Sequence, residues 1–268
     1  MPVPSFLQQA FESTAEHVHA GLPRRPCSAA DLAQTRVIAH RGERAQPGVA
    51  ENSFAAFDPL VDSGVWGIEF DVRWTRDLQP VVVHDADLQR VFGQSVRVAE
   101  LTLDALRDLQ PAIPTLEAMI DRYAERFHLM IELKAEPYPR PEKQRRRLEA
   151  ILSRLQAGQQ FHVLSLDTRL FGHVAGLPSA AWLPVARTNL REMSHFALQH
   201  HCAGLAGQFA LLGRRWIARH RSAGQVLGTG FPYHRQVMRR EINRGVRWLF
   251  SNHALRLQRL VDAEQRAR

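Results

Sequence analysis

Short apolar segments of strand type alternate with helical segments along most of this chain. Alternation of this kind favours a parallel sheet, because parallel neighbours need a crossover that is usually a helix. Eight barrel strands plus one antiparallel hairpin strand is the simplest assignment, and a (β/α)₈ TIM-type barrel takes about 250 residues. An open doubly wound sheet is the alternative. The strand candidates are residues 37–40, 67–72, 80–84, 129–134, 161–166, 182–186, 204–206, 225–227 and 247–250.

Helices are expected near residues 54–61, 143–156, 168–175, 191–201, 209–222, 233–243 and 254–266, and another opens at Thr115. Residues 5–19 predict a short amphipathic helix, which could lie on a membrane surface but is better explained as packing against the main domain. We therefore divide the chain into an N-terminal helical extension, 1–35, and a main barrel domain, 36–268.

The composition narrows the class of protein. No run of 18 apolar residues is present, so we expect no membrane span. The N-terminus does not read as a secretory leader, and Cys27 and Cys202 are too few and too distant for a disulfide framework. We expect a cytoplasmic protein, and the oligomeric state is not predictable from these features.

The chain is strongly basic, with a net charge of +8 and a pI near 10.6. No basic run is interleaved with aromatic residues as a nucleic-acid platform requires, so we expect no nucleic-acid partner. Only Lys134 and Lys143 are lysines, and the other 33 of 35 basic residues are arginines. A lysine in such a chain indicates a place where a compact charge is needed instead of a planar fork.

The first strand runs directly into His40-Arg41-Gly42. Arg41 could hold a phosphate oxygen while His40 moves a proton, and Gly42 lets the backbone turn sharply. Glu51 precedes a helix that Asn52 or Ser53 could cap. It is either a local complement to the helix dipole or a carboxylate that orients Arg41.

Polar residues recur on single faces of later strands. Glu69 and Asp71 alternate with apolar neighbours, so they share one face and would repel unless a cation lies between them. Oxygen ligands suit Mg²⁺ or Ca²⁺. A solvated face or an arginine-paired face is the alternative.

The strand that ends in His84 follows too closely for a crossover, so we expect a hairpin whose four-residue loop, 76–79, sets Asp71 opposite His84. Further on, Glu132 and Lys134 share a face at another strand end. They could form a buried ion pair, or Glu132 could be a third metal ligand with Lys134 contacting phosphate. Such strand ends are where barrels carry their active sites.

Taken together, six segments resemble the glycerophosphodiester phosphodiesterase family over residues 36–135. The segments are His40-Arg41-Gly42, Glu51-Asn52, Glu69-x-Asp71-Val72, His84-Asp85, Ile113-Pro114-Thr115-Leu116 and Ile131-Glu132-Leu133-Lys134. The resemblance implies a (β/α)₈ barrel, one divalent cation, Mg²⁺ or Ca²⁺, and hydrolysis of a small-molecule glycerophosphodiester to glycerol 3-phosphate and an alcohol.

The resemblance also implies roles for individual residues. Glu69, Asp71 and Glu132 match the metal carboxylates, and His40 and His84 match the acid-base histidines. Arg41 and Lys134 match the residues beside the phosphate. Which histidine is the acid and which the base is left open, as is whether water or a substrate hydroxyl is the nucleophile.

The chain departs from the family pattern in two places. After His84-Asp85, Arg90-Val91-Phe92-Gly93 replaces an Arg-Thr-Thr type segment, so we expect a shortened insertion and a more open mouth. Near the last two strands, residues 226–232 and 251–254 replace Trp-Thr-Val-Asn and Thr-Asp-x-Pro. These changes put the glycerol specificity in question, so a lysophospholipase D-type enzyme and a non-catalytic phosphate-binding barrel are kept as alternatives.

Overall fold

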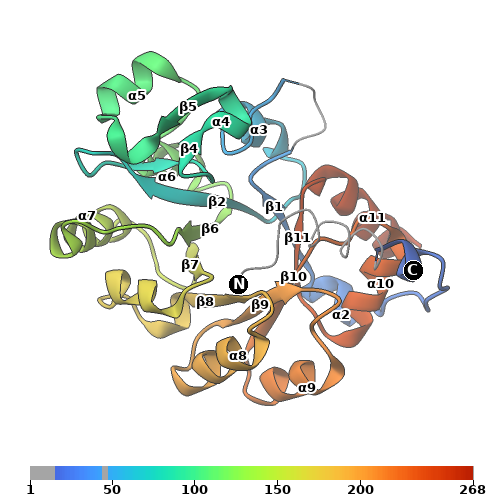
Figure 1. The fold of residues 1–268 in the computed structure, drawn as a ribbon. Helices are drawn as coiled ribbons and strands as arrows, with labels where there is room; N and C mark the ends of the chain where they lie inside the picture. Colours follow the sequence, from blue (N-terminus) through green and yellow to red (C-terminus); the bar gives the residue numbers. More distant parts are fainter. Residues whose placement is uncertain (1–15, 44–47, 268) are drawn as a thin grey trace.

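Eight parallel strands close into a barrel in the computed structural model, which describes residues 16–43 and 48–267 (Figure 1). Strand β1 pairs in parallel with β2 on one side and with β11 on the other, and this double pairing closes the sheet. The expected TIM barrel is therefore confirmed. Its strands are β1 (Arg36–His40), β2 (Gly67–Trp74), β6 (His128–Leu133), β7 (Phe161–Ser165), β8 (Trp182–Ala186), β9 (Gly204–Gln208), β10 (Val226–Gly230) and β11 (Trp248–Ser251).

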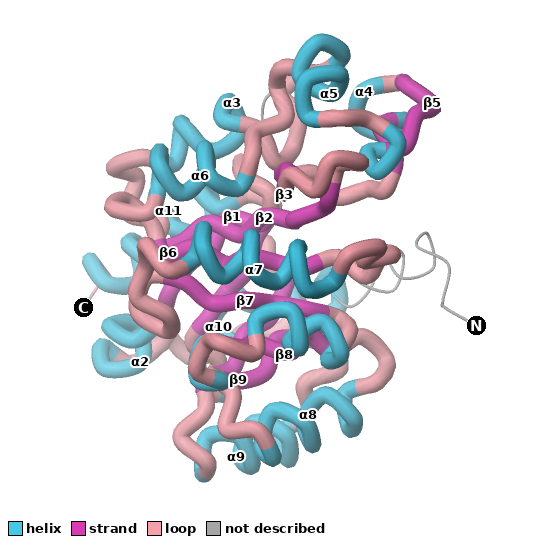
Figure 2. The backbone as a smooth tube through the Cα atoms, turned by 90° about the vertical axis from the view of Figure 1, so that its left-hand side faces the viewer, coloured by secondary structure: helices cyan, strands magenta, loops and turns pink. Residues whose placement is uncertain are grey.

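Helices surround the barrel on its outside, as the side view shows (Figure 2). The α-helices are α2 (Ala29–Gln34), α3 (Phe54–Phe57), α6 (Leu116–Tyr123), α7 (Pro141–Leu152), α8 (Leu190–Gln199), α9 (Arg214–Ser222), α10 (Arg235–Arg244) and α11 (Ala254–Arg266). The short 3₁₀ helices beside them are η1 (Asp58–Leu60), η3 (Thr168–Val174) and η4 (Ser179–Ala181). The segment expected as an α-helix at 168–175 is thus 3₁₀, and α9 begins five residues later than expected.

Side-chain alternation divides the apolar residues into two layers. One layer packs between strands and helices, and a smaller one, which includes Ile38, Met130 and Leu164, fills the barrel. Because residues two apart on a strand share a face, Ile38 lies below His40 and Met130 lies below Glu132. The polar strand ends therefore rest on a packed apolar plug.

Two histidines lie near the opposite end of the barrel. His128 Nε2 and His162 Nδ1 are 2.7 Å apart, and His128 Nδ1 lies 2.9 Å from the Gln159 carbonyl oxygen. The Trp66 ring stacks on His128 with a centroid distance of 4.2 Å. Burial lowers the pKa of His128 to about 4 and that of His162 to about 3, so both rings are neutral at pH 7.

The hairpin register is one residue away from the expected one. Strand β3 (Pro80–Val82) is antiparallel to β2, as predicted, but Val72 pairs with Val82, so Asp71 lies opposite Val83. The loop has five residues because Thr75 closes it: its backbone N–H donates to the Gln79 carbonyl, and its hydroxyl accepts the Gln79 N–H. His84 lies beyond the ladder.

The insertion after His84 has structure that the sequence did not predict. It contains β4 (Asp87–Leu88), α4 (Gln89–Phe92), β5 (Gln94–Arg97), η2 (Val98–Glu100) and α5 (Leu103–Leu109). An apolar cluster of its own, which includes Leu88, Val98 and Leu106, holds these elements together beside β3. The segment projects from the barrel near α3 (Figure 1).

The N-terminal helix expected at residues 5–19 falls mostly outside the described residues, and residues 16–20 are helical. The Glu16 carboxylate accepts the backbone N–H groups of Tyr233 and His234, at 2.9 and 2.8 Å, just before α10 begins. Residues 21–26 then connect to α2. Within the part of the chain that the structure describes, no helix is both long and apolar enough to cross a bilayer.

Candidate active site

The sheet register brings four of the predicted site residues together at one end of the barrel. His40 on β1 is paired with Glu69 on β2, and Asp71 on β2 is paired with Glu132 on β6. All four side chains are on the inner face, because they alternate with outward-facing residues. Three neighbouring strands thus place two pairs of polar residues, which include three carboxylates, at the carboxyl end of the barrel.

The turn after β1 depends on left-handed backbone at two consecutive residues. Arg41 has φ 58° and Gly42 has φ 92°. A Cβ atom added at Gly42 would lie 2.6 Å from the Ala56 Cβ, so only glycine fits this turn. The Arg41 N–H donates to the Glu69 carbonyl at 2.9 Å, which fixes the arginine beside the carboxylates.

Arg41 joins two carboxylates. Its Nη1 lies 3.1 Å from Glu51 Oε1, and its Nε lies 3.1 Å from Asp71 Oδ2. Glu51 therefore contacts Arg41, as one of the two sequence interpretations requires. Ser53, and not Asn52, caps α3, because the Ser53 hydroxyl accepts the Ala56 N–H. Asn52 instead donates from Nδ2 to Asp71 Oδ2 at 2.8 Å.

Glu69, Asp71 and Glu132 form a cluster in which one carboxylate oxygen from each residue lies within 4.8 Å of the other two, and all three residues are buried. Neither Glu69 oxygen accepts a hydrogen bond from any described residue. Burial, together with the charges of Asp71 and Glu132, raises the pKa of Glu69 well above its usual value. A hard divalent cation would relieve this repulsion, so the donor set fits Mg²⁺ or Ca²⁺.

Lys134 brings a positive charge to the same cluster. Its Nζ lies 2.7 Å from Asp71 Oδ1 and also contacts Glu132 Oε1. Burial alone would raise the pKa of Asp71, but Lys134 and Arg41 hold it below its usual range. The buried Glu132–Lys134 ion pair that the sequence offered as an alternative is present, and it coexists with the carboxylate cluster.

The two candidate acid-base histidines have different partners. His84 Nδ1 lies 2.7 Å from Asp85 Oδ1, and Arg73 Nε donates to the His84 carbonyl at 2.7 Å. Burial and the nearby Lys134 charge lower the pKa of His84 to about 4, although Asp71 opposes the shift. His84 is therefore a neutral imidazole at pH 7 that can accept a proton.

His40 is held by residues that follow the last two strands of the barrel, β10 and β11. Its Nδ1 lies 2.7 Å from Asn252 Oδ1, and its Nε2 lies 3.7 Å from Glu69 Oε2. The Phe231 ring packs against the imidazole with a centroid distance of 4.6 Å. Because an amide oxygen can only accept, this contact places the proton on Nδ1 and leaves Nε2 facing the carboxylates.

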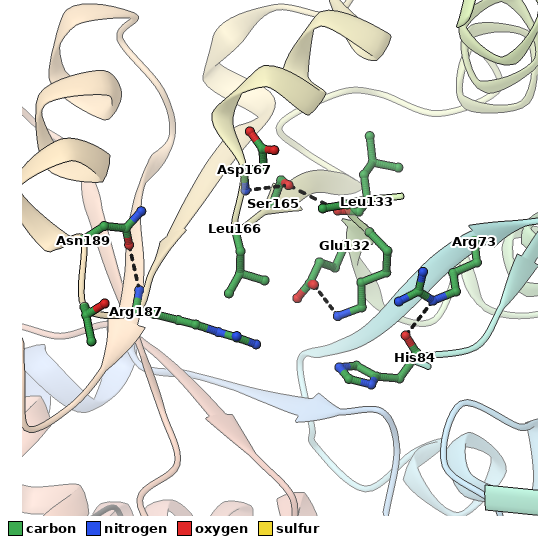
Figure 3. Close-up of a pocket in the computed structure, with 12 residues that line it drawn as sticks. Arg73, His84, Glu132, Leu133, Ser165, Leu166, Asp167, Arg187 and Asn189 are labelled. Carbon is green, nitrogen blue, oxygen red and sulfur yellow. Dashed lines mark hydrogen bonds and ion pairs between the residues drawn. The ribbon is translucent and has the colours of Figure 1, made fainter. Parts of the chain in front are cut away.

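A cavity of about 480 Å³ opens beside these groups. His84, Glu132 and Lys134 line one side, and Ser165, Asp167, Arg187 and Asn189 line the other. The Arg187 side chain extends across the cavity toward the side that holds His84 (Figure 3). Sequence reasoning missed Arg187, whose only signal is that it directly follows a predicted strand. Phe231 and Asn252 lie in the two segments that depart from the family pattern, but no role was predicted for either residue.

Residues 40–170 match the model of the glycerophosphoryl diester phosphodiesterase family. This segment, just under half of the chain, therefore carries the sequence pattern of that family. It is 42% identical over 112 residues to the Bacillus subtilis protein YhdW, a match that covers 38% of this chain and 45% of the relative. It is 33% identical over 114 residues to the glycerophosphodiester phosphodiesterase of Caldanaerobacter subterraneus, covering 38% and 46%. The matches thus span about half the length of these relatives.

Solved structures of glycerophosphodiester phosphodiesterases share the fold. The enzyme from Thermotoga maritima is 22% identical, with a TM-score of 0.70, and the alignment covers 83% of this chain and 96% of that one. An Oleispira antarctica phosphodiesterase, solved with the product sn-glycerol-3-phosphate, is 22% identical with a TM-score of 0.72, covering 85% and 96%. The family match ends at residue 170, so it includes both histidines and all three carboxylates but neither Arg187 nor Asn252.

Proposed function

We propose that this chain hydrolyses glycerophosphodiesters, releasing glycerol 3-phosphate and an alcohol. The observation that carries the proposal is the carboxylate cluster of Glu69, Asp71 and Glu132, lying beside His40 and near His84 at one barrel mouth. Mere binding of a phosphate needs no pair of proton-transfer groups. In this proposal residues 36–268 form the catalytic domain and residues 1–35 an extension.

The three carboxylates would hold one divalent cation, Mg²⁺ or Ca²⁺. When bound, the cation supplies Lewis-acid polarisation of the phosphoryl group. Arg41 and Lys134 would stabilise the negative charge that develops on the phosphate. Both are already oriented by ion pairs to Asp71, at 3.1 and 2.7 Å, so little reorganisation is needed when substrate binds.

His40 and His84 would move the protons. One removes a proton from the nucleophile, and the other delivers a proton to the leaving alkoxide. Asn252 holds His40 through Nδ1 and Asp85 holds His84 through Nδ1, so each ring presents its Nε2 for the reaction. Glu51 supports Arg41 from the side away from Asp71.

A substrate panel tests the proposal. The purified protein is assayed with glycerophosphocholine, glycerophosphoethanolamine, lysophosphatidylcholine and bis(p-nitrophenyl) phosphate, in Mg²⁺, in Ca²⁺ and in EDTA. We expect release of glycerol 3-phosphate that stops in EDTA and returns with one of the two cations. His40→Ala should abolish turnover, whereas His195→Ala, which removes an exposed histidine on α8, should not.

Other outcomes would replace parts of the proposal. Activity that survives complete chelation would remove the cation from it. Preference for lysophosphatidylcholine would identify a lysophospholipase D-type enzyme. If no diester is turned over and His40→Ala binds phosphate as well as the wild type does, the barrel is a phosphate-binding module.

A further inference from the structure

A second cavity, of about 450 Å³, lies between residues 23–25, the start of α9 and the later part of α10. It shares no lining residue with the cavity beside His84. Helices α9 and α10 are neighbours on the outside of the barrel (Figure 1). None of the cavity's lining residues is acidic. Five of them are arginines: Arg24, Arg25, Arg214, Arg240 and Arg244.

The guanidinium groups of this arginine cavity are only partly neutralised by the protein. Arg240 and Arg244 share one carboxylate oxygen, Oε1 of the fully buried Glu241, and Arg244 also donates to the Leu212 carbonyl. The Nε atoms of Arg24 and Arg244 are buried and donate to no described residue. Positive charge and hydrogen-bond donors therefore exceed what the neighbouring side chains satisfy.

The electrostatics of Arg244 agree with this arrangement. Its side chain is 14% exposed, and burial lowers its pKa despite the nearby Glu241 carboxylate. The charges of Arg240 and Arg214 lower it further, so both guanidiniums lie close enough to repel Arg244. An anion placed among them would be strongly favoured.

The N-terminus of α9 adds donors to the same cavity. The helix begins at Arg214, its N-cap is Gly213, and its first turn contains no acidic residue. No side chain therefore caps the first backbone N–H groups, and the helix dipole favours negative charge here. A Cβ added at Gly213 would meet nothing within 4 Å, so the space in front of the helix is open.

The chemistry of these groups selects a phosphate. Guanidinium forks match phosphate oxygens in pairs, and the volume leaves room for a substituent such as glycerol. Leu22, which is 44% exposed, precedes the lining residue Pro23, and Leu211, which is 38% exposed, lies two residues before Gly213. Exposed apolar side chains beside a phosphate site are what a phospholipid head group at a membrane surface would meet.

We propose that the arginine cavity is a second phosphate-binding site, separate from the hydrolytic centre, which takes a phosphomonoester or phosphodiester group. The group comes either from an anionic phospholipid head group or from a free phosphoester such as glycerol 3-phosphate. Neither source requires turnover at the barrel mouth, so the inference stands or falls independently of the hydrolytic activity.

The test compares two double variants that remove the same charge. Arg25→Gln with Arg214→Gln removes two lining arginines that do not contact Glu241, and Arg215→Gln with Arg219→Gln removes two exposed arginines of α9 outside the cavity. Calorimetric titration with inorganic phosphate and with glycerol 3-phosphate measures the number of sites. Sedimentation with phosphatidylcholine vesicles, with and without phosphatidylglycerol, measures lipid binding, and thermal unfolding checks that both variants fold.

For a free phosphoester we expect one more binding site in the wild type and in the control variant than in the cavity variant. For a lipid head group we expect binding to phosphatidylglycerol vesicles that weakens about ten-fold in the cavity variant, because two guanidinium donors to the phosphate are lost. Equal stoichiometry in all three proteins, combined with vesicle binding that is absent or the same in both variants, would overturn the proposal.

Discussion

Arg90 Nη2 lies 2.5 Å from Glu51 Oε1, and the same guanidinium places its Nε 2.5 Å from Asp85 Oδ2. Each of these carboxylates holds a residue at the mouth of the barrel: Glu51 contacts Arg41 and Asp85 contacts His84. One arginine of the insertion thus connects the supports of the proposed phosphate contact and of one proposed acid-base histidine.

Arg90→Gln should lower kcat by about ten-fold, because Glu51 and Asp85 lose the shared partner that orients them beside Arg41 and His84. The melting temperature should change little, since half of the Arg90 side chain is exposed. Steady-state kinetics on the best substrate, with Arg107→Gln on α5 as the control within the insertion, measures the effect. An unchanged kcat in Arg90→Gln would show that the insertion does not position the site.

Glu69 and Asp71 should respond in opposite directions to loss of charge in the metal-free protein. Glu69→Gln should raise the melting temperature in EDTA, because the Glu69 carboxylate accepts no hydrogen bond and repels Asp71 and Glu132. Asp71→Asn should lower it, because Lys134 and Arg41 lose their partner. Both variants should lose the increase that Mg²⁺ or Ca²⁺ gives the wild type. Calorimetry in EDTA, with and without excess cation, measures these melting temperatures. A Glu69→Gln variant that melts below the wild type in EDTA would contradict the proposed role of the cluster.

Asn252 should affect the rate of turnover by orienting the His40 ring. Asn252→Leu removes the acceptor for Nδ1, so the ring can rotate or change tautomer, and kcat should fall by about ten-fold or more with little change in KM. Asn252→Asp retains an acceptor and should recover part of the loss. If the leucine and aspartate variants have the same kcat, the contact does not orient His40.

The histidine pair at the closed end of the barrel should make the fold acid-sensitive. Below pH 6.5 the unfolded chain takes up protons, whereas folded His128 and His162 stay neutral down to about pH 4 and 3. Unfolding therefore binds protons, and the free energy of unfolding should fall with pH in this window by up to about 1.4 kcal/mol per unit for each ring.

The slope is measured by denaturant titration between pH 6.5 and pH 4 in the Glu69→Gln background, because the raised pKa of Glu69 has the opposite sign there. Adding His162→Gln should make the slope shallower, and adding His195→Gln at an exposed position should not. Equal slopes in the two proteins would mean that the pair takes no part in acid unfolding.

The polar residues at the strand ends could be predicted from the sequence, because the alternation of apolar and polar residues that marks them lies within a few consecutive residues. Glu69, Asp71 and Glu132 alternate with apolar residues, and the barrel register then brings them together. The hairpin register was wrong by one residue, because it depends on the Thr75 hydroxyl and not on the apolar pattern. The short insertion was expected, but its secondary structure was not predicted, since its strands have only two and four residues.

The supporting residues could not be predicted for a different reason. Asn252 meets His40 across 212 residues of sequence, and Arg90 meets Glu51 across 39. Neither contact leaves a periodic signal in the chain. The arginine cavity is similar: its members come from three separated segments, each of which reads alone as an ordinary charged surface.

The closure of the barrel also has a consequence for biosynthesis. Strand β1 is held between β2 and β11, and His40 is held by a residue that follows β11. A nascent chain still lacking β11 would expose one edge of its first strand and leave this histidine without its amide partner. The proposed hydrolysis should therefore begin only after the last strand has left the ribosome, so that its onset reports completed translation of the barrel.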